Sequence, residues 1–267
     1  MQFLVKILLF ALVISAFSCS SFDKLVKSSD YELKYKKALE YFNSGNYTNA
    51  QTLLEELIPI FKGTERAEEV YYYYAYCSYY QSDYGLAAYH FKTFARTFSR
   101  SKHVEECSFL NAYCYYKNSP NYSLDQADTK NAIQEMQQFI NDFSESWLVD
   151  SCNRVMDGLR LKLEKKSYET CKQYFFIDDW KAAIVEGGNF LKDYPDSKKQ
   201  EEINFLIIKS YYLLALNSIE SKKQERLIKG METYLKFVDL YPESIYLKDA
   251  EKIYGEFQKL KNEKINN

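Results

Sequence analysis

The sequence contains few of the residues that break helices or build catalytic centres. Among 267 residues there are 8 Gly and 4 Pro, which argues against a fold made of many short strands and turns. The only two histidines are His90 and His103, and no Cys-x-x-Cys or His-Glu-x-x-His spacing occurs. A phosphate-binding loop, a Gly-x-Ser-x-Gly turn and a Gly-rich dinucleotide turn are also missing. We therefore expect no catalytic residues, no metal site and no cofactor.

A strong positive charge is missing as well. The formal net charge is −2 at pH 7, whereas a protein that binds phosphate backbones needs a basic face. We therefore expect no nucleic acid partner. With 46% hydrophobic and 27% charged residues the chain has enough apolar surface to fold. Its 26 tyrosines exceed what a modest core requires, and Tyr offers contact area while tolerating water.

The sequence begins with a short hydrophobic run. Ile7–Ile14 is too short to span a bilayer and follows the positively charged Lys6, so residues 1–18 read as an export signal peptide. The next residue, Cys19, ends the stretch Ala16-Phe17-Ser18-Cys19, which is similar to a bacterial lipobox although Ala16 stands where Leu is usual. We expect Cys19 to be the lipid-attachment residue, anchoring the protein to a membrane. The alternative is an ordinary signal peptide followed by an incidental cysteine.

The residue after Cys19 suggests which membrane the protein is attached to. It is Ser20 rather than the Asp that commonly retains lipoproteins in the inner membrane, so the resemblance to lipoproteins implies attachment to the outer membrane, facing the periplasm. Residues 19–29 form the expected linker. If these roughly ten residues were extended at about 3.3 Å each, they would hold the folded body within about 35 Å of the lipid surface.

The other five cysteines do not form a pattern typical of a disulfide framework. Their number is odd, and Cys77 and Cys114 are separated by 37 residues. We interpret them as small core residues at equivalent places in a repeat.

A period of 37 residues organises the chain. Ala38, Ala75 and Ala112 follow one another at this step, as do Tyr47 and Tyr84. Apolar residues recur at helical spacing on both sides of a Gly45-Asn46 break, and small residues stand where two helices would cross. The pattern predicts an all-α fold, a tetratricopeptide-repeat solenoid of about five helix pairs plus a closing C-terminal helix.

The third repeat carries an insertion. Ala112 and Ala132 are 20 residues apart, whereas Ala38 and Ala50 are 12 apart. The extra residues fall in the turn-rich stretch 118–125, which we expect to project from the solenoid.

Related phrases close four of the repeats, and each combines an aromatic residue with a serine that can cap the next helix. They are Phe98-Ser99-Arg100-Ser101, Phe143-Ser144-Glu145-Ser146, Tyr194-Pro195-Asp196-Ser197 and Tyr241-Pro242-Glu243-Ser244. We expect N-terminal repeats one to three in residues 30–146 and C-terminal repeats four and five with the closing helix in residues 147–260. Residues 261–267 read as a polar tail.

Lipidated cysteine, short linker, five repeats and closing phrases together resemble the BamD family of outer-membrane β-barrel assembly lipoproteins. The stretch Asp125-Gln126-Ala127-Asp128-Thr129-Lys130-Asn131-Ala132, running on to Phe139 and Phe143-Ser144, is similar to the third-repeat hairpin of that family. The resemblance implies a non-enzymatic scaffold with two kinds of partner. It would bind the periplasmic domains of the barrel-forming, BamA-like subunit through its C-terminal repeats, and it would bind unfolded outer-membrane proteins.

A ladder of apolar residues marks a possible substrate groove. The first helices of tetratricopeptide pairs line one face of the stack, and positions spaced by four and three residues share that face. These positions are Tyr35, Leu39 and Phe42, then Tyr72, Tyr76 and Tyr79, then Phe109, Tyr113 and Tyr116. An apolar groove suggests a surface meant to be covered, for instance by an aromatic-rich barrel strand. The alternative, strongest for the first and third position of each set, is packing against neighbouring helices.

Two other functional classes stay open. A different tetratricopeptide lipoprotein could act as an adaptor in cell-envelope coordination or glycan uptake, although only Trp147 and Trp180 are available as Trp platforms for sugars. An enzyme would require a catalytic constellation, and the many carboxylates fall on helical surfaces among lysines.

Overall fold

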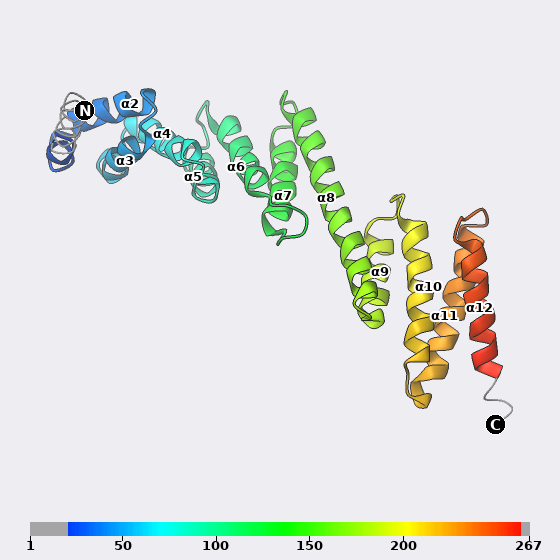
Figure 1. Cartoon of the computed structure of the whole chain (residues 1–267). Coiled ribbons are helices and arrows are strands. Elements are labelled where there is room, and N and C mark those ends of the chain that lie inside the picture. Colours follow the sequence, from blue (N-terminus) through cyan, green and yellow to red (C-terminus); the bar gives the residue numbers. More distant parts are fainter. Residues whose placement is uncertain (1–20, 263–267) are drawn as a thin grey trace, which may run out of the picture. The chain divides into compact units, whose positions relative to one another are not determined.

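The computed structural model describes residues 21–262, and this part of the chain contains helices and no strands. The helices are α2 (Tyr31–Asn43), α3 (Tyr47–Phe61), α4 (Arg66–Tyr80), α5 (Tyr84–Thr97), α6 (Val104–Asn118), α7 (Ala127–Asp142), α8 (Val149–Phe176), α9 (Trp180–Asp193), α10 (Gln200–Leu216), α11 (Glu220–Leu240) and α12 (Leu247–Asn262). Consecutive helices pair as α2/α3, α4/α5, α6/α7, α8/α9 and α10/α11, and α12 closes the series (Figure 1). The all-α fold with five helix pairs and a closing helix is confirmed. The predicted signal peptide and Cys19 lie outside the described residues.

The chain divides into two compact units. Unit 1 comprises the residues up to Pro120 together with Asp125–Met156, and unit 2 comprises Asn121–Leu124 together with the residues from Asp157 onward. Unit 1 therefore holds α2 to α7 and the start of α8. Unit 2 holds the rest of α8, the helices α9 to α12 and a piece of the third-repeat insertion.

Small residues at the helix crossings let paired helices approach closely. Ala38, Ala50, Ala75 and Ala87 are fully buried where α2 meets α3 and where α4 meets α5. In unit 2 the tightest approach is at Gly230 of α11, where a Cβ atom would lie 2.4 Å from Cζ of Phe257 in α12. The spacing of small residues in the sequence therefore sets where the helices cross.

The turns inside three helix pairs share one backbone design. Gly45, Ser82 and Asp178 adopt the left-handed conformation, with φ of 80°, 62° and 62°. The next residue is Asn46, Asp83 or Asp179, and its side chain accepts a hydrogen bond from the backbone N–H three residues later. These N-caps begin α3, α5 and α9.

The four closing phrases form a repeated hydrogen-bonded latch. In each phrase the final serine donates its hydroxyl to a glutamate of an earlier helix, and the same oxygen accepts a backbone N–H from two residues further on. The pairs are Ser101–Glu68, Ser146–Glu105, Ser197–Glu164 and Ser244–Glu201, at 2.6, 2.6, 2.5 and 2.5 Å. The latch aligns the beginning of one helix pair with the first helix of the pair before it, because the serine is tied both to the backbone of its own turn and to a side chain of that earlier helix.

Part of the expected linker is folded. Residues 21–26 are helical, and Phe22, Leu25 and Val26 pack against the core of the first helix pair. Lys34 of α2 is buried, pairs with Glu56 and donates to the backbone oxygen of Val26 at 2.5 Å. This portion of residues 19–29 is therefore not an extended tether, because its apolar side chains are better buried than exposed.

The third-repeat insertion does not project freely as the sequence suggested. Lys166 of α8 donates to the backbone oxygens of Tyr122 and Leu124 at 3.3 and 2.8 Å. The ammonium group of Lys165 lies 4.2 Å from the ring centroid of Tyr122. Two adjacent lysines of α8 therefore hold the insertion against that helix, a contact that no local pattern in the insertion could reveal.

Candidate functional site

The nine predicted groove residues all lie in unit 1, on the first helices α2, α4 and α6. Eight of them are half-buried, and Tyr116 is slightly more open, at 37% exposure. The structure does not bring them together as one uniform surface. Their environments differ from one helix to the next and are best described helix by helix.

In α2 the predicted residues pack mainly against other rings. Phe42 lies 4.8 Å from Tyr73 and 5.5 Å from Tyr47, measured between ring centroids. The Arg66 guanidinium lies 5.0 Å from the ring centroid of Tyr35. The first repeat therefore supports the alternative interpretation, in which these positions join neighbouring helices.

In α4 two of the tyrosines share one carboxylate. The hydroxyl of Tyr72 donates to Oε2 of Glu106 at 3.0 Å, and the hydroxyl of Tyr76 donates to Oε1 of the same residue. His103 stacks on Tyr72 with 4.3 Å between ring centroids and contacts Glu106 through Nδ1 at 3.2 Å. Burial raises the pKa of Tyr76, and the hydrogen bond to Glu106 raises it further, so this phenol stays protonated.

The Tyr72–Tyr76–Glu106 cluster joins α4 to α6. Tyr76 also packs edge-on against Phe91 at 5.1 Å between centroids. Its ring and its hydroxyl are therefore both engaged within the protein. The cluster is therefore a hydrogen-bonded link between two helices, and the hydroxyls of Tyr72 and Tyr76 are occupied by Glu106.

In α6 the three predicted residues form a continuous aromatic run. Phe109 and Tyr113 stack at 5.6 Å with an angle of 19° between ring planes, and Tyr113 and Tyr116 follow at 5.5 Å. Phe109 is anchored against the buried Phe139 of α7. All three rings are partly exposed, and Tyr116 is the most open of the nine predicted residues.

Unit 2 contains equivalent positions that sequence reasoning missed. The latch glutamates Glu164 and Glu201 set the register, and the residues four, eight and eleven positions after them correspond to the groove ladder. These residues are Tyr168, Lys172 and Phe175 in α8, and Phe205, Lys209 and Tyr212 in α10. They escaped the 37-residue count because α8 is longer than the other first helices, which shifts the phase of the repeat.

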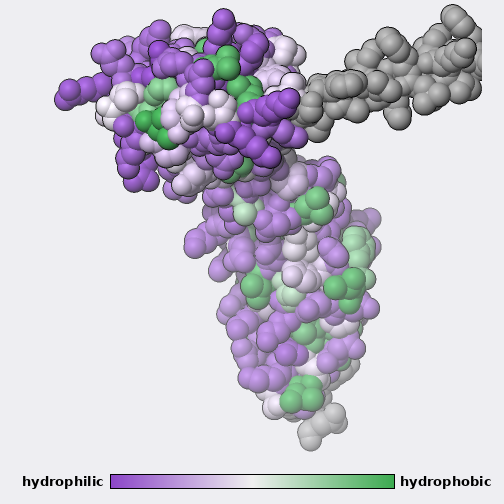
Figure 2. Space-filling view, turned by 90° about the vertical axis from the view of Figure 1, so that its left-hand side faces the viewer, coloured by the Kyte–Doolittle hydropathy of each residue, from purple (hydrophilic) through white to green (hydrophobic). Residues whose placement is uncertain are grey.

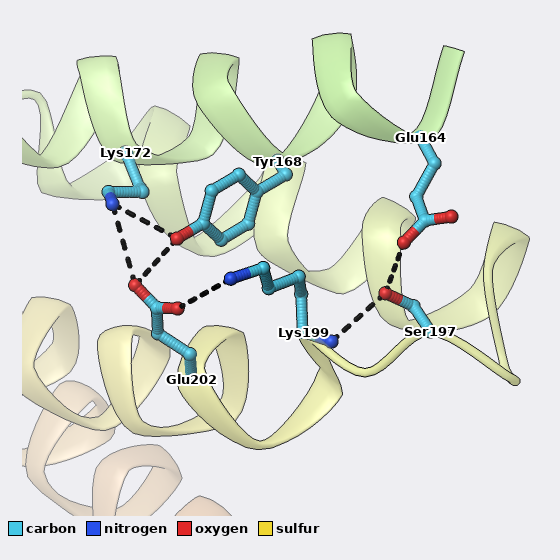
Figure 3. A network of polar contacts seen from close by, with 6 residues as sticks. All are labelled: Glu164, Tyr168, Lys172, Ser197, Lys199 and Glu202. Atoms are coloured by element: carbon cyan, nitrogen blue, oxygen red, sulfur yellow. Dashed lines mark hydrogen bonds and ion pairs between the residues drawn. The ribbon is translucent and has the colours of Figure 1, made fainter. Parts of the chain in front are cut away.

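The middle position therefore changes from apolar in unit 1 to cationic in unit 2. Lys172 donates to the hydroxyl of Tyr168 at 3.0 Å and lies 3.5 Å from Oε1 of Glu202, which also accepts the Tyr168 hydroxyl at 2.7 Å (Figure 3). The hydrogen bond to Tyr168 raises the pKa of Lys172. Lys209 lies over the rings of Phe175 and Phe205, at 5.0 and 5.6 Å. Unit 2 thus offers positive charge between aromatic faces.

Among residues 21–262 the candidate metal ligands are dispersed and the thiols are buried. Among residues 21–262 no cluster of three or more His, Cys, Asp or Glu side chains has the arrangement to hold a metal ion. Cys77, Cys114 and Cys171 are fully buried, and burial raises the pKa of each thiol to about 12. Such thiols are poor nucleophiles because the thiolate is the reactive form.

The face drawn in Figure 2 is mostly hydrophilic, and its hydrophobic residues form small separate patches between polar ones. Within residues 21–262 no helix is both long enough and apolar enough to cross a membrane.

One family of known proteins matches most of the chain. The sequence model of the family described as "YfiO: Outer membrane lipoprotein" matches residues 28–227. No curated protein matches the chain. Among solved structures, the crystal structure of the P58(IPK) TPR domain is similar, with 14% identity and a TM-score of 0.41, over 90% of this chain and 58% of that one. The TPR2AB domain of yeast Sti1 in a pHSP90 complex has 11% identity and a TM-score of 0.38, over 86% of this chain and 99% of that one. The chain thus spans about three fifths of the first of these two structures.

Proposed function

Because the chain belongs to the YfiO family of outer membrane lipoproteins, we propose that it is a non-enzymatic scaffold of the machinery that assembles β-barrels in the outer membrane. The observation that carries the proposal is the family match, which runs from residue 28 through both units as far as α11. In this proposal Cys19 carries the lipid, the folded units face the periplasm, and residues 30–146 and 147–260 are its N-terminal and C-terminal functional parts.

The proposed partner of unit 2 is the barrel-forming subunit, through its periplasmic domains. The helices α10, α11 and α12 pack against one another. Tyr234 of α11 stacks on Tyr254 of α12 with 4.3 Å between ring centroids, and the buried Phe257 of α12 contacts Tyr212 of α10. The cationic positions Lys172 and Lys209 favour a partner surface that contains carboxylates.

The proposed ligands of unit 1 are unfolded barrel proteins. The stacked run Phe109, Tyr113 and Tyr116 offers aromatic faces at helical spacing, which suits a segment rich in aromatic side chains. Tyr72 and Tyr76 would support this surface through Glu106 rather than contact the ligand with free hydroxyls.

The test is a mild-detergent pull-down from outer membranes with a C-terminal tag, in which the retained proteins are identified by mass. We expect recovery of a barrel protein with several periplasmic repeat domains. Lys209→Glu on α10 should reduce that recovery, whereas Lys192→Glu, an exposed lysine of α9, should not.

A different set of retained proteins would replace the proposal. Recovery of peptidoglycan enzymes or of a glycan transporter, without a barrel-forming subunit, would indicate an adaptor in cell-envelope coordination or glycan uptake instead.

A further inference from the structure

Three first helices bury one face against the second helix of the preceding pair. This face consists of positions spaced by four and three residues, and it is 0 to 8% exposed. The residues are Val70, Tyr74 and Cys77 in α4, Cys107, Asn111 and Cys114 in α6, and Ile203, Ile207 and Ser210 in α10. Each set lies two, six and nine residues after the latch glutamate of its own helix, so the face is a constant feature of these helices.

The second half of α8 presents the same face without a cover. The latch glutamates Glu164 of α8 and Glu201 of α10 are equivalent residues, 37 positions apart. The residues of α8 that correspond to the buried set of α10 are therefore Lys166, Thr170 and Gln173. Lys166 and Thr170 are half-buried and Gln173 is exposed. No second helix precedes this half of α8, because α8 runs without interruption from Val149 to Phe176.

The uncovered face forms the floor of an open groove of about 500 Å³ within unit 2. The insertion closes one end, where Lys166 holds the backbone oxygens of Tyr122 and Leu124. Phe176 and Ile177 lie at the other end and are 71% and 62% exposed.

The turn between α8 and α9 does not require an apolar residue at position 177. The same turn in the second repeat places Gln81 before the left-handed Ser82, where this turn places Ile177 before the left-handed Asp178. A polar residue therefore satisfies the backbone equally well. Phe176 and Ile177 are thus two adjacent exposed apolar side chains at the end of the groove, an arrangement typical of contact surfaces.

The groove also carries unneutralised positive charge. Lys166 lines the groove and binds neutral carbonyls, and Lys165 lies next to the groove, over the ring of the lining residue Tyr122. Among the described residues neither lysine forms an ion pair with a carboxylate. Glu169 is the one acidic side chain that lines the groove in this part of the chain, and Lys172, which also lines it, is paired with Glu202. An acidic occupant is therefore electrostatically favoured.

We propose that this groove binds an amphipathic helix of a partner protein, one that carries acidic side chains beside an apolar stripe. The partner helix covers this half of α8 in the way that α3, α5 and α9 cover α4, α6 and α10. Its apolar stripe lies on Phe176 and Ile177, and its carboxylates lie near Lys165 and Lys166. The reason for a helix is geometric, since a helix covers the equivalent face in α4, α6 and α10.

The test uses a fluorescein-labelled peptide of about four helical turns, with Leu at helical spacing and Glu beside each Leu. Its binding to the detergent-solubilised full chain is measured by fluorescence anisotropy, against a matched peptide with Lys in place of every Glu. We expect the acidic peptide to bind at least about fivefold more tightly. Lys165→Glu and Phe176→Ser should each weaken it by a similar factor.

Matched variants on α9 control for general changes in charge and hydrophobicity. Lys192→Glu and Val185→Ser alter exposed residues of the same types outside the groove and should leave the affinity unchanged. Equal binding of both peptides, no binding at all, or equal losses in the α9 variants would overturn the proposal.

A second measurement tests the native partner. A photo-crosslinking residue at Gln173 in intact membranes should couple to a helical segment rich in Asp and Glu of another protein. Coupling to a second copy of this chain or to lipid would also overturn the proposal.

Discussion

The hydroxyl of Ser197 donates a 2.5 Å hydrogen bond to Oε1 of Glu164, and the Ser197 oxygen accepts the backbone N–H of Lys199 at 3.0 Å (Figure 3). This one side chain thereby joins α8 to the loop between α9 and α10. The same arrangement recurs at Ser101, Ser146 and Ser244. The serine is therefore the constant part of the closing phrases, while the residues before it vary between Ser-Arg, Ser-Glu, Pro-Asp and Pro-Glu.

Removal of a latch hydroxyl should destabilise the protein. We expect Ser146→Ala to lower the free energy of unfolding by about 1 to 2 kcal/mol, because it removes a hydrogen bond to a carboxylate and a backbone cap. Urea unfolding followed by circular dichroism measures this change. Ser144→Ala in the same phrase is the control, since Ser144 is exposed and contacts only the adjacent Glu145. Equal effects of the two substitutions would contradict a specific role for the latch.

Gly230→Ala should also destabilise the protein, through steric overlap. The added Cβ would lie 2.4 Å from Cζ of Phe257 and 3.0 Å from Cβ of Tyr211, so α11 and α12 must separate. We expect a loss of about 1 to 3 kcal/mol in the free energy of unfolding. Gly188→Ala in α9, where nothing lies within 4 Å, should instead stabilise the protein by up to about 1 kcal/mol. Thermal unfolding of both variants checks the opposite signs.

Tyr113→Ser should weaken the binding of aromatic-rich C-terminal peptides of barrel proteins. The substitution removes the central ring of the Phe109–Tyr113–Tyr116 run, and the usual contribution of one aromatic contact, about 0.5 to 1.5 kcal/mol, predicts a loss of affinity of about 2- to 13-fold. Tyr89→Ser on α5 is the control, because Tyr89 is 62% exposed and lies outside the predicted groove. Isothermal titration with one labelled peptide would compare the variants.

The companion substitution Tyr76→Ser should also weaken peptide binding. Because Tyr76 packs on Phe91 and donates to Glu106, this change should in addition lower stability. Tyr76→Phe separates the two effects, since it keeps the ring and removes only the hydroxyl. Unchanged affinity in Tyr113→Ser and Tyr76→Ser at unchanged helicity would remove the groove hypothesis.

Stability should fall at mildly acid pH because of His90. Burial lowers the pKa of His90 below its ordinary value of 6.5, although Asp83 opposes the shift. The unfolded state therefore binds the proton more readily than the folded state, and the free energy of unfolding decreases as pH falls through 6.5. Urea unfolding between about pH 7.5 and pH 5 measures the slope.

His90→Phe should reduce this slope, because Phe cannot take up a proton. The same substitution removes the hydrogen-bond partner of the Tyr71 hydroxyl, which lies 3.0 Å from Nδ1, so the variant should also be less stable at pH 7.5. An unchanged slope in His90→Phe would mean that other groups cause the acid dependence.

Much of the fold could be predicted from local patterns. The 37-residue step and the turn at Gly45-Asn46 predicted helix pairs, and α2 ends at Asn43, just before that turn. The next helix, α3, begins at Tyr47 because Asn46 caps it. The crossing alanines were also correctly identified as core residues, since a side chain without bulk is required where helices touch.

The contacts of the groove residues could not be predicted from local sequence patterns. Sequence spacing placed Tyr76 mid-groove, yet its hydroxyl is taken up by Glu106, 30 residues away. The positions Lys172 and Lys209 were missed because the long α8 changes the phase of the repeat. Both outcomes depend on contacts between helices that are distant in sequence.

The sequence by itself determined the helices, their pairing and the latch serines, because propensity, apolar period and capping act over a few residues and repeat along the chain. Only the tertiary structure decided which aromatic rings pack and which stay open, that the insertion lies against Lys165 and Lys166, and that one face of α8 is left uncovered. The physical reason is that burial depends on which second helix meets which first helix, and a continuous α8 removes one such helix from the series.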